Sequence, residues 1–393
     1  MDGFEKGILR RVARQMKGAM LYVNAGKGHY IPAKALQDSF IEAGYECVLE
    51  DLFVVFDTPF WEFFCKYDWR FLLHHPNFEP LLHKTTDTRF NFKLIKAQGI
   101  AKHKLRSFEK WYNENKPDFI VSTNFLGGIF LPEACRLLGI DIPIYQYAAD
   151  VFDSPISGIN PDLTRMYVPS VLGKENVIKR GQPEETVATC PFPLQTHFEK
   201  YVKLTKHEAR DKLGLENKFT VLVNLGGEGI WNTALLRELV ERNYDIQVVA
   251  IGGLSVTTQN AFKRFRQDNP HFTFLYRGFV SNVQEYISAC DVQIGKAGAN
   301  AVMESMYIGR PFIVTQILYA FRASKDFFEN RKVGWCENNV IKQADIIGSL
   351  YLNPDCLDRI DDRFATLPMN FGAAKFRDQI ICDTQEYYRT RLK

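Results

Sequence analysis

The sequence predicts an α/β fold made of two doubly wound domains, and three observations support this prediction. The chain has 393 residues, a length beyond the size at which a single hydrophobic core keeps growing. Apolar β-branched runs alternate with helical patterns through most of the chain, which is typical of parallel sheets built from βαβ units. Residues 190–194 contain two prolines and interrupt the alternation at mid-chain. We therefore predict an N-terminal domain at 1–192, a C-terminal domain at 193–365, and a terminal helix at 366–393 that packs back on the first domain.

Composition excludes several classes of protein. The chain is 46% hydrophobic and 24% charged with a net charge of +3, so it is neither disordered nor collagen-like. It has no run of about 18 uncharged apolar residues, and charged residues early in the chain break any signal-peptide core. Its eight cysteines are scattered without a Cys-x-x-Cys pair, which indicates reduced thiols rather than a zinc site. We expect a cytoplasmic protein.

The first domain is predicted to start with a strand at 19–23, a glycine-bearing loop and a helix at 31–43 that Gly44 ends. A second helix is predicted at 133–138. The other predicted strands cover residues 47–49, 119–122, 142–146, 166–168 and 187–189.

The second domain is predicted to open with a capping box at 205–208 and a helix that ends at Leu213. Its predicted strands cover residues 220–224, 247–251, 272–275, 292–294 and 311–314, each separated by a helical stretch. This regular alternation indicates a doubly wound sheet.

Three loops between a strand and a helix carry residues suited to binding or catalysis. Residues 24–29 read Asn-Ala-Gly-Lys-Gly-His, residues 224–229 read Asn-Leu-Gly-Gly-Glu-Gly, and residues 294–300 read Ile-Gly-Lys-Ala-Gly-Ala-Asn. Glycines let a ligand approach backbone N–H groups, and the helix N-terminus that follows favours negative charge. Neither the dinucleotide fingerprint nor the Walker pattern is present. For each of the three loops, an ordinary structural turn between a strand and a helix stays the alternative.

Motifs in both halves carry a resemblance to a known family. They are Gly-x-Gly-His at 26–29, Val-Ser-Thr at 121–123, Gly-Gly-Glu-Gly at 226–229, Gly-Phe-Val-Ser-Asn at 278–282, Ala-Cys-Asp-Val-Gln-Ile-Gly-Lys-Ala-Gly at 289–298, and Glu-Ser-Met-Tyr-Ile-Gly-Arg-Pro at 304–311. The sequence resembles the GT-B glycosyltransferases that include monogalactosyldiacylglycerol synthases, processive diacylglycerol glucosyltransferases and the lipid-linked N-acetylglucosamine transferase of peptidoglycan synthesis. The resemblance implies two Rossmann-like domains that face each other across a cleft.

By position, the resemblance implies a UDP-sugar donor site in the second domain. Uracil is expected at Phe279 and Val280, and the ribose on Glu304. The diphosphate is expected around Gly227, Gly229, Lys296, Ala297 and Gly298. Where relatives place Gln or Glu for the sugar hydroxyls, this chain reads Tyr-Ala-Phe-Arg-Ala-Ser-Lys at 319–325, so the donor sugar stays open.

The resemblance also implies an inverting displacement without a tightly bound metal or another cofactor, in which one base deprotonates the acceptor hydroxyl. His29 is the first candidate, because a pKa near 6.5 suits a base at neutral pH. Asp150 is the second, either as the base or as the group that orients a positive charge.

An aromatic and basic insertion follows the second predicted strand. Residues 53–71 include nine aromatic side chains, and residues 84–110 hold eight Lys or Arg against two acidic residues. Such a mixture suits an anionic bilayer surface. We therefore predict that the acceptor and the membrane contact Gly28, Trp61, Phe64, Trp69, Lys93 and Lys96. A nucleic-acid partner is disfavoured because the basic charge is confined to this insertion.

The leading expectation is a peripheral enzyme on the inner face of the cell membrane that moves a hexose from a UDP-sugar to diacylglycerol or a related lipid. One alternative is transfer to a polyprenyl-diphosphate intermediate, for which Lys27 would contact the acceptor diphosphate. Another is a soluble UDP-N-acetylglucosamine 2-epimerase. A membrane scaffold without activity is a third, and it requires a donor site that fails to bind nucleotide.

Overall fold

The protein is described by a computed structural model that covers residues 16–24, 27–59, 61–63, 65, 67, 78–99, 101–227, 233–296, 298–316 and 322–391. The chain divides into two compact units. The first comprises Met1–Glu199 together with Pro368–Lys393, and the second is Lys200–Leu367. Sequence analysis placed the corresponding boundaries at 192 and 365.

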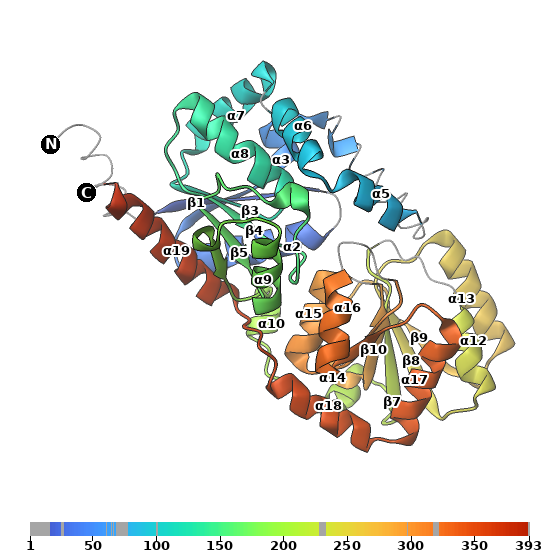
Figure 1. The fold of residues 1–393 in the computed structure, drawn as a ribbon. Coiled ribbons are helices and arrows are strands. Elements are labelled where there is room, and N and C mark those ends of the chain that lie inside the picture. Colours follow the sequence, from blue (N-terminus) through green and yellow to red (C-terminus); the bar gives the residue numbers. More distant parts are fainter. Residues whose placement is uncertain are drawn as a thin grey trace. The chain divides into compact units, whose positions relative to one another are not determined.

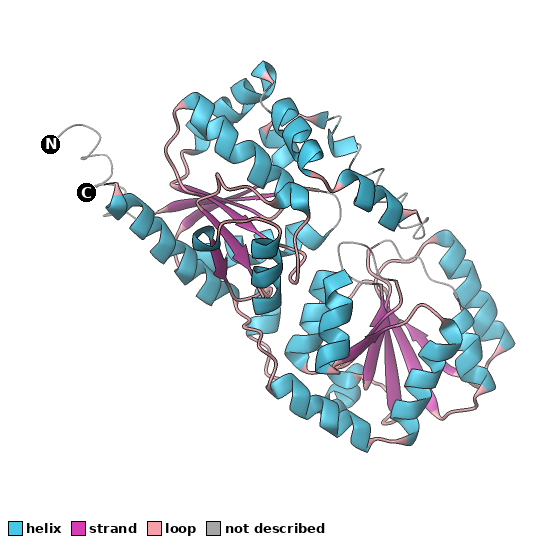
Figure 2. Ribbon diagram, in the orientation of Figure 1, coloured by secondary structure: helices cyan, strands magenta, loops and turns pink. Residues whose placement is uncertain are grey.

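The first unit contains a six-stranded parallel sheet in the order β2-β1-β3-β4-β5-β6, flanked by helices on both faces (Figures 1 and 2). Its strands are β1 (Lys17–Tyr22), β2 (Glu46–Asp51), β3 (Phe119–Ser122), β4 (Ile144–Tyr147), β5 (Arg165–Val168) and β6 (Val187–Thr189). Its α-helices are α2 (Lys27–Glu42), α3 (Leu52–Val55), α5 (Glu79–Thr86), α6 (Arg89–Gly99), α7 (Lys102–Asn115), α8 (Phe125–Leu138), α9 (Val171–Lys179), α10 (Thr196–Glu199) and α19 (Ala373–Thr390), with short 3-10 helices at Ile156–Gly158 and Glu184–Thr186.

Two apolar clusters cover the two faces of this sheet. One includes Phe108 of α7 and Phe130 of α8, and the other includes Phe40 of α2 and Phe376 of α19. Helix α19 is also held by hydroxyl groups. Tyr167 donates to Asp383 at 2.5 Å, and Tyr388 of α19 donates to a backbone carbonyl oxygen next to β3 at 2.7 Å. The C-terminal helix thus belongs to the core of the first unit.

The second unit contains a parallel sheet in the order β12-β11-β10-β7-β8-β9, again between helices (Figure 2). Its strands are β7 (Phe219–Asn224), β8 (Ile246–Ile251), β9 (Thr273–Tyr276), β10 (Val292–Gly295), β11 (Phe312–Val314) and β12 (Gly334–Cys336). Its helices are α11 (Lys206–Leu213), α12 (Ala234–Glu241), α13 (Val256–Asp268), α14 (Val283–Ala289), α15 (Ala299–Ile308), α16 (Arg322–Arg331), α17 (Val340–Leu352) and α18 (Asp355–Ala365). The predicted capping box at Thr205 is present at the start of α11.

Each sheet has one point where the strand order reverses. In the first unit this switch point lies between β1 and β3, and in the second it lies between β7 and β10. Ligands of doubly wound sheets bind outside the carboxyl ends of the strands at such points. The loops that follow β1, β3, β7 and β10 are therefore where sites are expected.

The two predicted parallel sheets are confirmed, and three details of the prediction are wrong. Helix α2 begins at Lys27 rather than at residue 31, so His29 lies in its first turn. Helix α8 begins at Phe125 rather than at residue 133, because Asn124 caps it and its glycine pair lets the helix approach the sheet. A Cβ at Gly128 would lie 1.6 Å from the side-chain oxygen of Gln146. Strand β12, at Gly334–Cys336, was not predicted.

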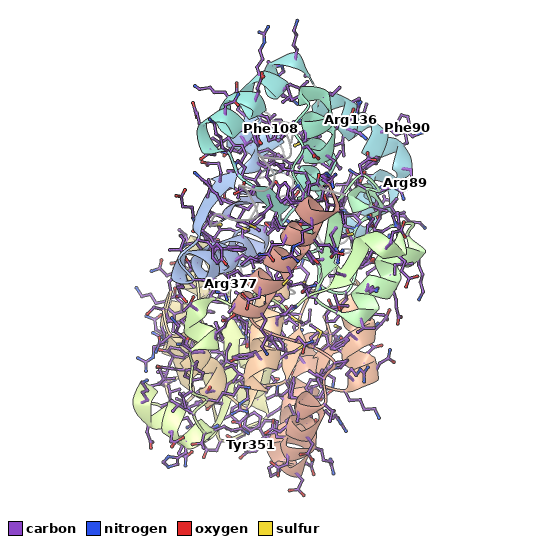
Figure 3. The ribbon with its side chains drawn as sticks, turned by 90° about the vertical axis from the view of Figure 1, so that its left-hand side faces the viewer. Arg89, Phe90, Phe108, Arg136, Tyr351 and Arg377 are labelled. Atoms are coloured by element: carbon purple, nitrogen blue, oxygen red, sulfur yellow. The ribbon has the colours of Figure 1, made fainter. Side chains whose placement is uncertain are left out.

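The insertion between β2 and β3 is tied to the rest of the first unit through its basic residues. Arg89 donates to the carbonyl oxygen of Ile159 at 2.8 Å, and Lys96 forms ion pairs with Asp162 at 2.9 Å and Glu133 at 3.2 Å. Figure 3 shows Arg89 and Phe90 next to each other on the surface of this unit. Among the described helices, none combines the length and the apolar character needed to cross a bilayer.

Candidate active site

His29 lies at the switch point of the first sheet and is held by the segment that follows β3. Its Nδ1 is 2.7 Å from the carbonyl oxygen of Thr123, and its Nε2 is 3.0 Å from the side-chain nitrogen of Asn124. The Thr123 hydroxyl also donates to the carbonyl oxygen of His29 at 2.8 Å. Burial lowers the pKa of His29, and the bond to Thr123 partly opposes this shift. The ring is therefore neutral at pH 7 and retains a basic nitrogen.

Asp150 follows β4, whose carboxyl end lies at the same edge of the sheet as that of β3. It opens a strained turn. The N–H of Phe152 donates to the carbonyl oxygen of Asp150 at 2.6 Å, and the residue between them, Val151, has a φ of 61°. A positive φ is a rare and strained conformation for a β-branched residue, and such strain clusters at functional sites.

Helix α9 holds this turn in place. Ser170 donates from its hydroxyl to the carbonyl oxygen of Val151 at 2.6 Å, and Asn176 donates to that of Phe152 at 2.9 Å. A Cβ at Gly173 would lie 2.4 Å from the carbonyl oxygen of Val151, so glycine is required there for close approach. The surrounding structure thus maintains the strained conformation next to Asp150.

Carboxylates surround Asp150. Burial, then the charges of Asp153 and Asp87, raise its pKa to about 7. Arg180 donates to Asp153 at 2.6 Å and forms an ion pair with Asp87 at 3.6 Å. Arg180 is thus the cationic partner of both neighbours, and Asp150 titrates near neutral pH.

The site in the second unit is built from glycines at the carboxyl ends of its strands. Gly226, Gly252 and Gly278 follow β7, β8 and β9 and have φ values of 63°, 111° and 71°. The N–H of Gly252 donates to the carbonyl oxygen of Gly278, and the N–H of Gly253 to that of Gly226, both at 2.8 Å. A Cβ at Gly252 would lie 2.7 Å from the oxygen of Gly226. The three loops therefore pack together at one edge of the sheet.

Phe279 lies on this glycine surface. Its side chain is 77% exposed, and its ring edge is 3.3 Å from the position that a Cβ of Gly253 would occupy. The next residue, Val280, is half-buried. An aromatic ring that stays solvent-exposed beside a glycine pair offers a flat surface for a nucleobase.

Lys296, Gly298 and Glu304 follow β10 across the switch point from the loop that contains Gly227. Gly298 is the N-cap of α15, and a Cβ there or at Gly227 would have no neighbour within 4 Å. Glu304 is half-buried, and burial raises its pKa to about 8. No described residue forms a hydrogen bond or an ion pair with its carboxyl group, and burial is the cause of the shift. Gly229 and Ala297 lie outside the described residues.

The predicted acceptor and membrane residues differ in their surroundings. Gly28 and Lys93 are exposed, whereas Trp61 packs against the core of the first unit and Lys96 is engaged in its two ion pairs. Phe64 and Trp69 lie outside the described residues. Large exposed apolar side chains on this part of the unit are Val54, Phe63, Tyr67, Phe78, Leu81, Phe90 and Leu94.

Sequence reasoning missed Asn124, Gly252 and Gly253. The two glycines follow a predicted strand directly, and this position could have identified them. Nothing in the sequence pairs Asn124 with a histidine 95 residues earlier. In the part of the chain that the structure describes, no three His, Cys, Asp or Glu side chains form a cluster able to hold a metal ion.

Comparison with known proteins defines the class of this protein. Residues 230–332 match the family described as glycosyltransferase family 28 C-terminal domain. The fold is similar to that of Acinetobacter baumannii MurG, with a TM-score of 0.60 and 13% identity over 94% of this chain and 99% of that one. It is also similar to Anabaena HepE in complex with UDP, with a TM-score of 0.58 and 13% identity over 93% and 98% of the two chains. The chain is a glycosyltransferase with the two-domain α/β fold of the GT-B group, as the sequence predicts.

Curated relatives narrow this class. The chain is 26% identical over 320 residues to monogalactosyldiacylglycerol synthase 1 of Arabidopsis thaliana, which covers 77% of this chain and 58% of that protein. It is 24% identical over 298 residues to the processive diacylglycerol beta-glucosyltransferase of Bacillus pumilus, which covers 75% and 76%. A probable monogalactosyldiacylglycerol synthase 2 of Oryza sativa subsp. indica is 24% identical over 81% of this chain and 70% of that protein. The predicted resemblance to these diacylglycerol glycosyltransferases is confirmed.

Proposed function

We propose that the protein transfers a hexose from a UDP-sugar to diacylglycerol or a related lipid, with inversion at the anomeric carbon. The observation that carries this proposal is that each unit has a different kind of site at its switch point. One holds a neutral imidazole, and the other holds glycine-lined loops with an exposed phenylalanine and a half-buried glutamate. The named relatives, which are diacylglycerol glycosyltransferases, support the lipid as the acceptor.

In this proposal the second unit binds the donor. Phe279 and Val280 contact uracil, and the carboxyl group of Glu304 accepts hydrogen bonds from the ribose diol. The diphosphate lies against Gly227, Gly298 and the N-terminus of α15, where backbone N–H groups and the helix dipole favour negative charge. Lys296 follows β10 directly and adds a positive charge to this edge of the sheet.

The first unit supplies the base. The acceptor hydroxyl gives its proton to Nε2 of His29 while its oxygen forms the bond to the anomeric carbon, and UDP leaves with the electron pair of the broken bond. A direct displacement of this kind inverts the configuration and needs no tightly bound metal or other cofactor. Asp150, with its pKa near 7, is the second proton acceptor of the unit.

The insertion is proposed to bind the bilayer, at the cytoplasmic face of the membrane. On α6, Phe90, Lys93 and Leu94 are exposed, while Phe92 and Ile95 pack against the core. A helix with one packed face and one exposed face of apolar and basic residues suits the boundary of an anionic membrane. Each basic residue near such a surface contributes about 1 kcal/mol to binding.

The test is UDP release with UDP-glucose, UDP-galactose or UDP-N-acetylglucosamine, with and without anionic vesicles that contain diacylglycerol, followed by mass analysis of the lipids. We expect vesicle-dependent release and a gain of one or two hexoses. Release without lipid, or conversion of the nucleotide sugar alone, would contradict the proposal and favour an epimerase, whose Neisseria meningitidis form shares this fold at a TM-score of 0.58. Transfer of a hexosamine in a parallel assay with a polyprenyl diphosphate as the acceptor would identify the other alternative.

Membrane binding is tested separately by vesicle sedimentation of a Phe90→Ala, Leu94→Ala double variant. Val256→Ala is the matched control, because Val256 is 74% exposed, as Phe90 is at 75%, but belongs to the second unit. We expect weaker sedimentation of the double variant and unchanged sedimentation of the control. Equal binding by all three proteins would exclude α6 from the membrane contact.

A further inference from the structure

The side chain of Asn124 contacts two elements of the first unit at once. It lies in the connection between β3 and α8 and is the N-cap of α8, where its oxygen accepts from the N–H of Leu126 at 2.9 Å. An N–H group can only donate, so the amide oxygen faces α8. The amide nitrogen therefore faces Nε2 of His29, 3.0 Å away.

The other side of the His29 ring is determined in the same way. Nδ1 lies 2.7 Å from the carbonyl oxygen of Thr123, which can only accept, so Nδ1 carries a proton. The N–H of Thr123 donates to the carbonyl oxygen of Leu21 at 2.9 Å, and its hydroxyl donates to that of His29 at 2.8 Å. These bonds hold Thr123, whose carbonyl oxygen accepts the hydrogen bond from Nδ1–H of His29, in a fixed position.

Only one tautomer of the His29 ring satisfies the hydrogen bonds of both ring nitrogens. Nδ1 donates to a carbonyl, and the lone pair of Nε2 accepts from an amide. We propose that Asn124 is a positioning residue that holds His29 in the Nδ1–H tautomer and keeps Nε2 as its proton-accepting atom. This inference deepens the proposed function, because it names the residue that prepares the base.

The arrangement also determines how the acceptor must bind. Nε2 has a single lone pair, so an acceptor hydroxyl reaches it only by replacing the Asn124 amide. After proton transfer, Nε2–H and the amide N–H groups are both donors and no longer attract each other. The amide cannot rotate to offer its oxygen without placing its nitrogen against the N–H of Leu126. Asn124 thus favours the neutral ring, as a base needs before each turnover.

Charged groups do not compete with this effect in the described part of the first unit. Burial and the Thr123 bond are the causes of the shift in the pKa of His29, and no charged side chain contributes. From the β3–α8 connection, the ring faces Thr123 and Asn124, which do not titrate. On its own helix, Lys27 lies over the ring of Tyr30 at 4.8 Å, and Tyr30 packs against Tyr22 of β1. The effect of the Asn124 amide on His29 can therefore be tested by a single substitution.

The test replaces Asn124 by aspartate, which has nearly the same shape and still caps α8 but offers His29 an acceptor with a negative charge. Asn339→Asp is the matched control, because Asn339 caps α17 of the second unit through a bond to the N–H of Lys342 at 3.1 Å. Histidine-selective nitrogen NMR across pH reports the tautomer and the pKa of His29 directly. The resonance is assigned from its absence in a His29→Gln variant.

We expect the Nδ1–H tautomer in the native protein and a pKa of His29 that rises by about one to two units in Asn124→Asp and stays unchanged in Asn339→Asp. The acid limb of the turnover profile should move by the same amount. An unchanged pKa in Asn124→Asp, or the opposite tautomer in the native protein, would overturn the inference. The NMR measurements need no substrate. If the NMR results hold but no lipid is glycosylated, the proposed function fails and the role of Asn124 stands.

Discussion

The two units have similar parallel sheets but different chemistry at their switch points. In the first unit the side chains at the switch point bond to one another, as His29 does to Asn124 and Thr123. In the second unit the loops after β7, β8 and β9 contain glycines with positive φ, and Glu304 has no partner among the described residues. One unit presents a prepared proton acceptor, and the other presents open backbone and a desolvated carboxyl group.

This difference shows how two similar parallel sheets support two different roles, proton transfer and nucleotide binding. Proton transfer needs a side chain with one defined protonation state, which requires fixed neighbours. Binding of a nucleotide needs access to backbone N–H groups, which glycines provide because they have no side chain. It also needs donors or acceptors that have no partner within the protein. The comparison therefore predicts that substitutions in the first unit change turnover, whereas substitutions in the second change affinity.

The largest effect is expected for His29→Gln. Loss of the general base should lower turnover by about 10²- to 10⁴-fold, while the affinity for UDP, measured by calorimetry, stays within about twofold. His207→Gln is the control, because His207 is on α11 of the second unit and pairs with Asp211 at 2.9 Å. Full activity of His29→Gln would show that His29 is not the base and would favour Asp150.

Glu304→Gln should have the next largest effect and should act on affinity. A neutral amide accepts hydrogen bonds less strongly than a carboxylate, so UDP should bind about 10- to 100-fold more weakly. Because the pKa of Glu304 is raised to about 8, UDP affinity of the native protein relative to the variant should increase as pH rises from 6 to 9. A ratio of the two UDP affinities that stays constant from pH 6 to 9 would show that the carboxylate of Glu304 does not contact the ribose.

Phe279→Ala should weaken UDP binding by about 2- to 10-fold, the contribution of one stacked pair. Its thermal stability should be unchanged, because the ring is exposed and supports no core. Val256→Ala, an equally exposed substitution on α13, should bind UDP as the native protein does. Normal affinity of Phe279→Ala would place the nucleobase elsewhere.

The last prediction concerns stability, measured as the melting temperature of Asp150→Asn relative to the native protein at different pH values. The folded state raises the pKa of this carboxyl group from 3.8 to about 7, so ionisation destabilises the fold progressively as pH rises through this range. The variant should match the native protein near pH 4 and melt at a higher temperature above pH 7, by about 2 to 4 °C for each 1 kcal/mol that ionisation of Asp150 costs the native fold. A difference that does not depend on pH would contradict the raised pKa.

Much of the fold could be predicted from the sequence, because buried parallel strands are continuous apolar runs separated by helical periods. Where the prediction was wrong, a residue's role depended on a distant partner. Gly127 and Gly128 disfavour a helix by their intrinsic propensity, but they let α8 approach Ser122 and Gln146 of the neighbouring strands. The strained φ of Val151 likewise depends on Ser170 and Asn176, which follow it by about 20 residues.

The alternation of strands and helices and the loop motifs that identify the class could be predicted from the chain alone, since these are local patterns. Which loops meet at each switch point, and which atom of His29 accepts a proton, depends on the packing of distant segments. The tautomer depends on Thr123 and Asn124, more than 90 residues away in the chain, and the raised pKa values of Asp150 and Glu304 depend on burial. Burial and hydrogen-bond direction are properties of the folded chain, so they appear only when distant segments pack together.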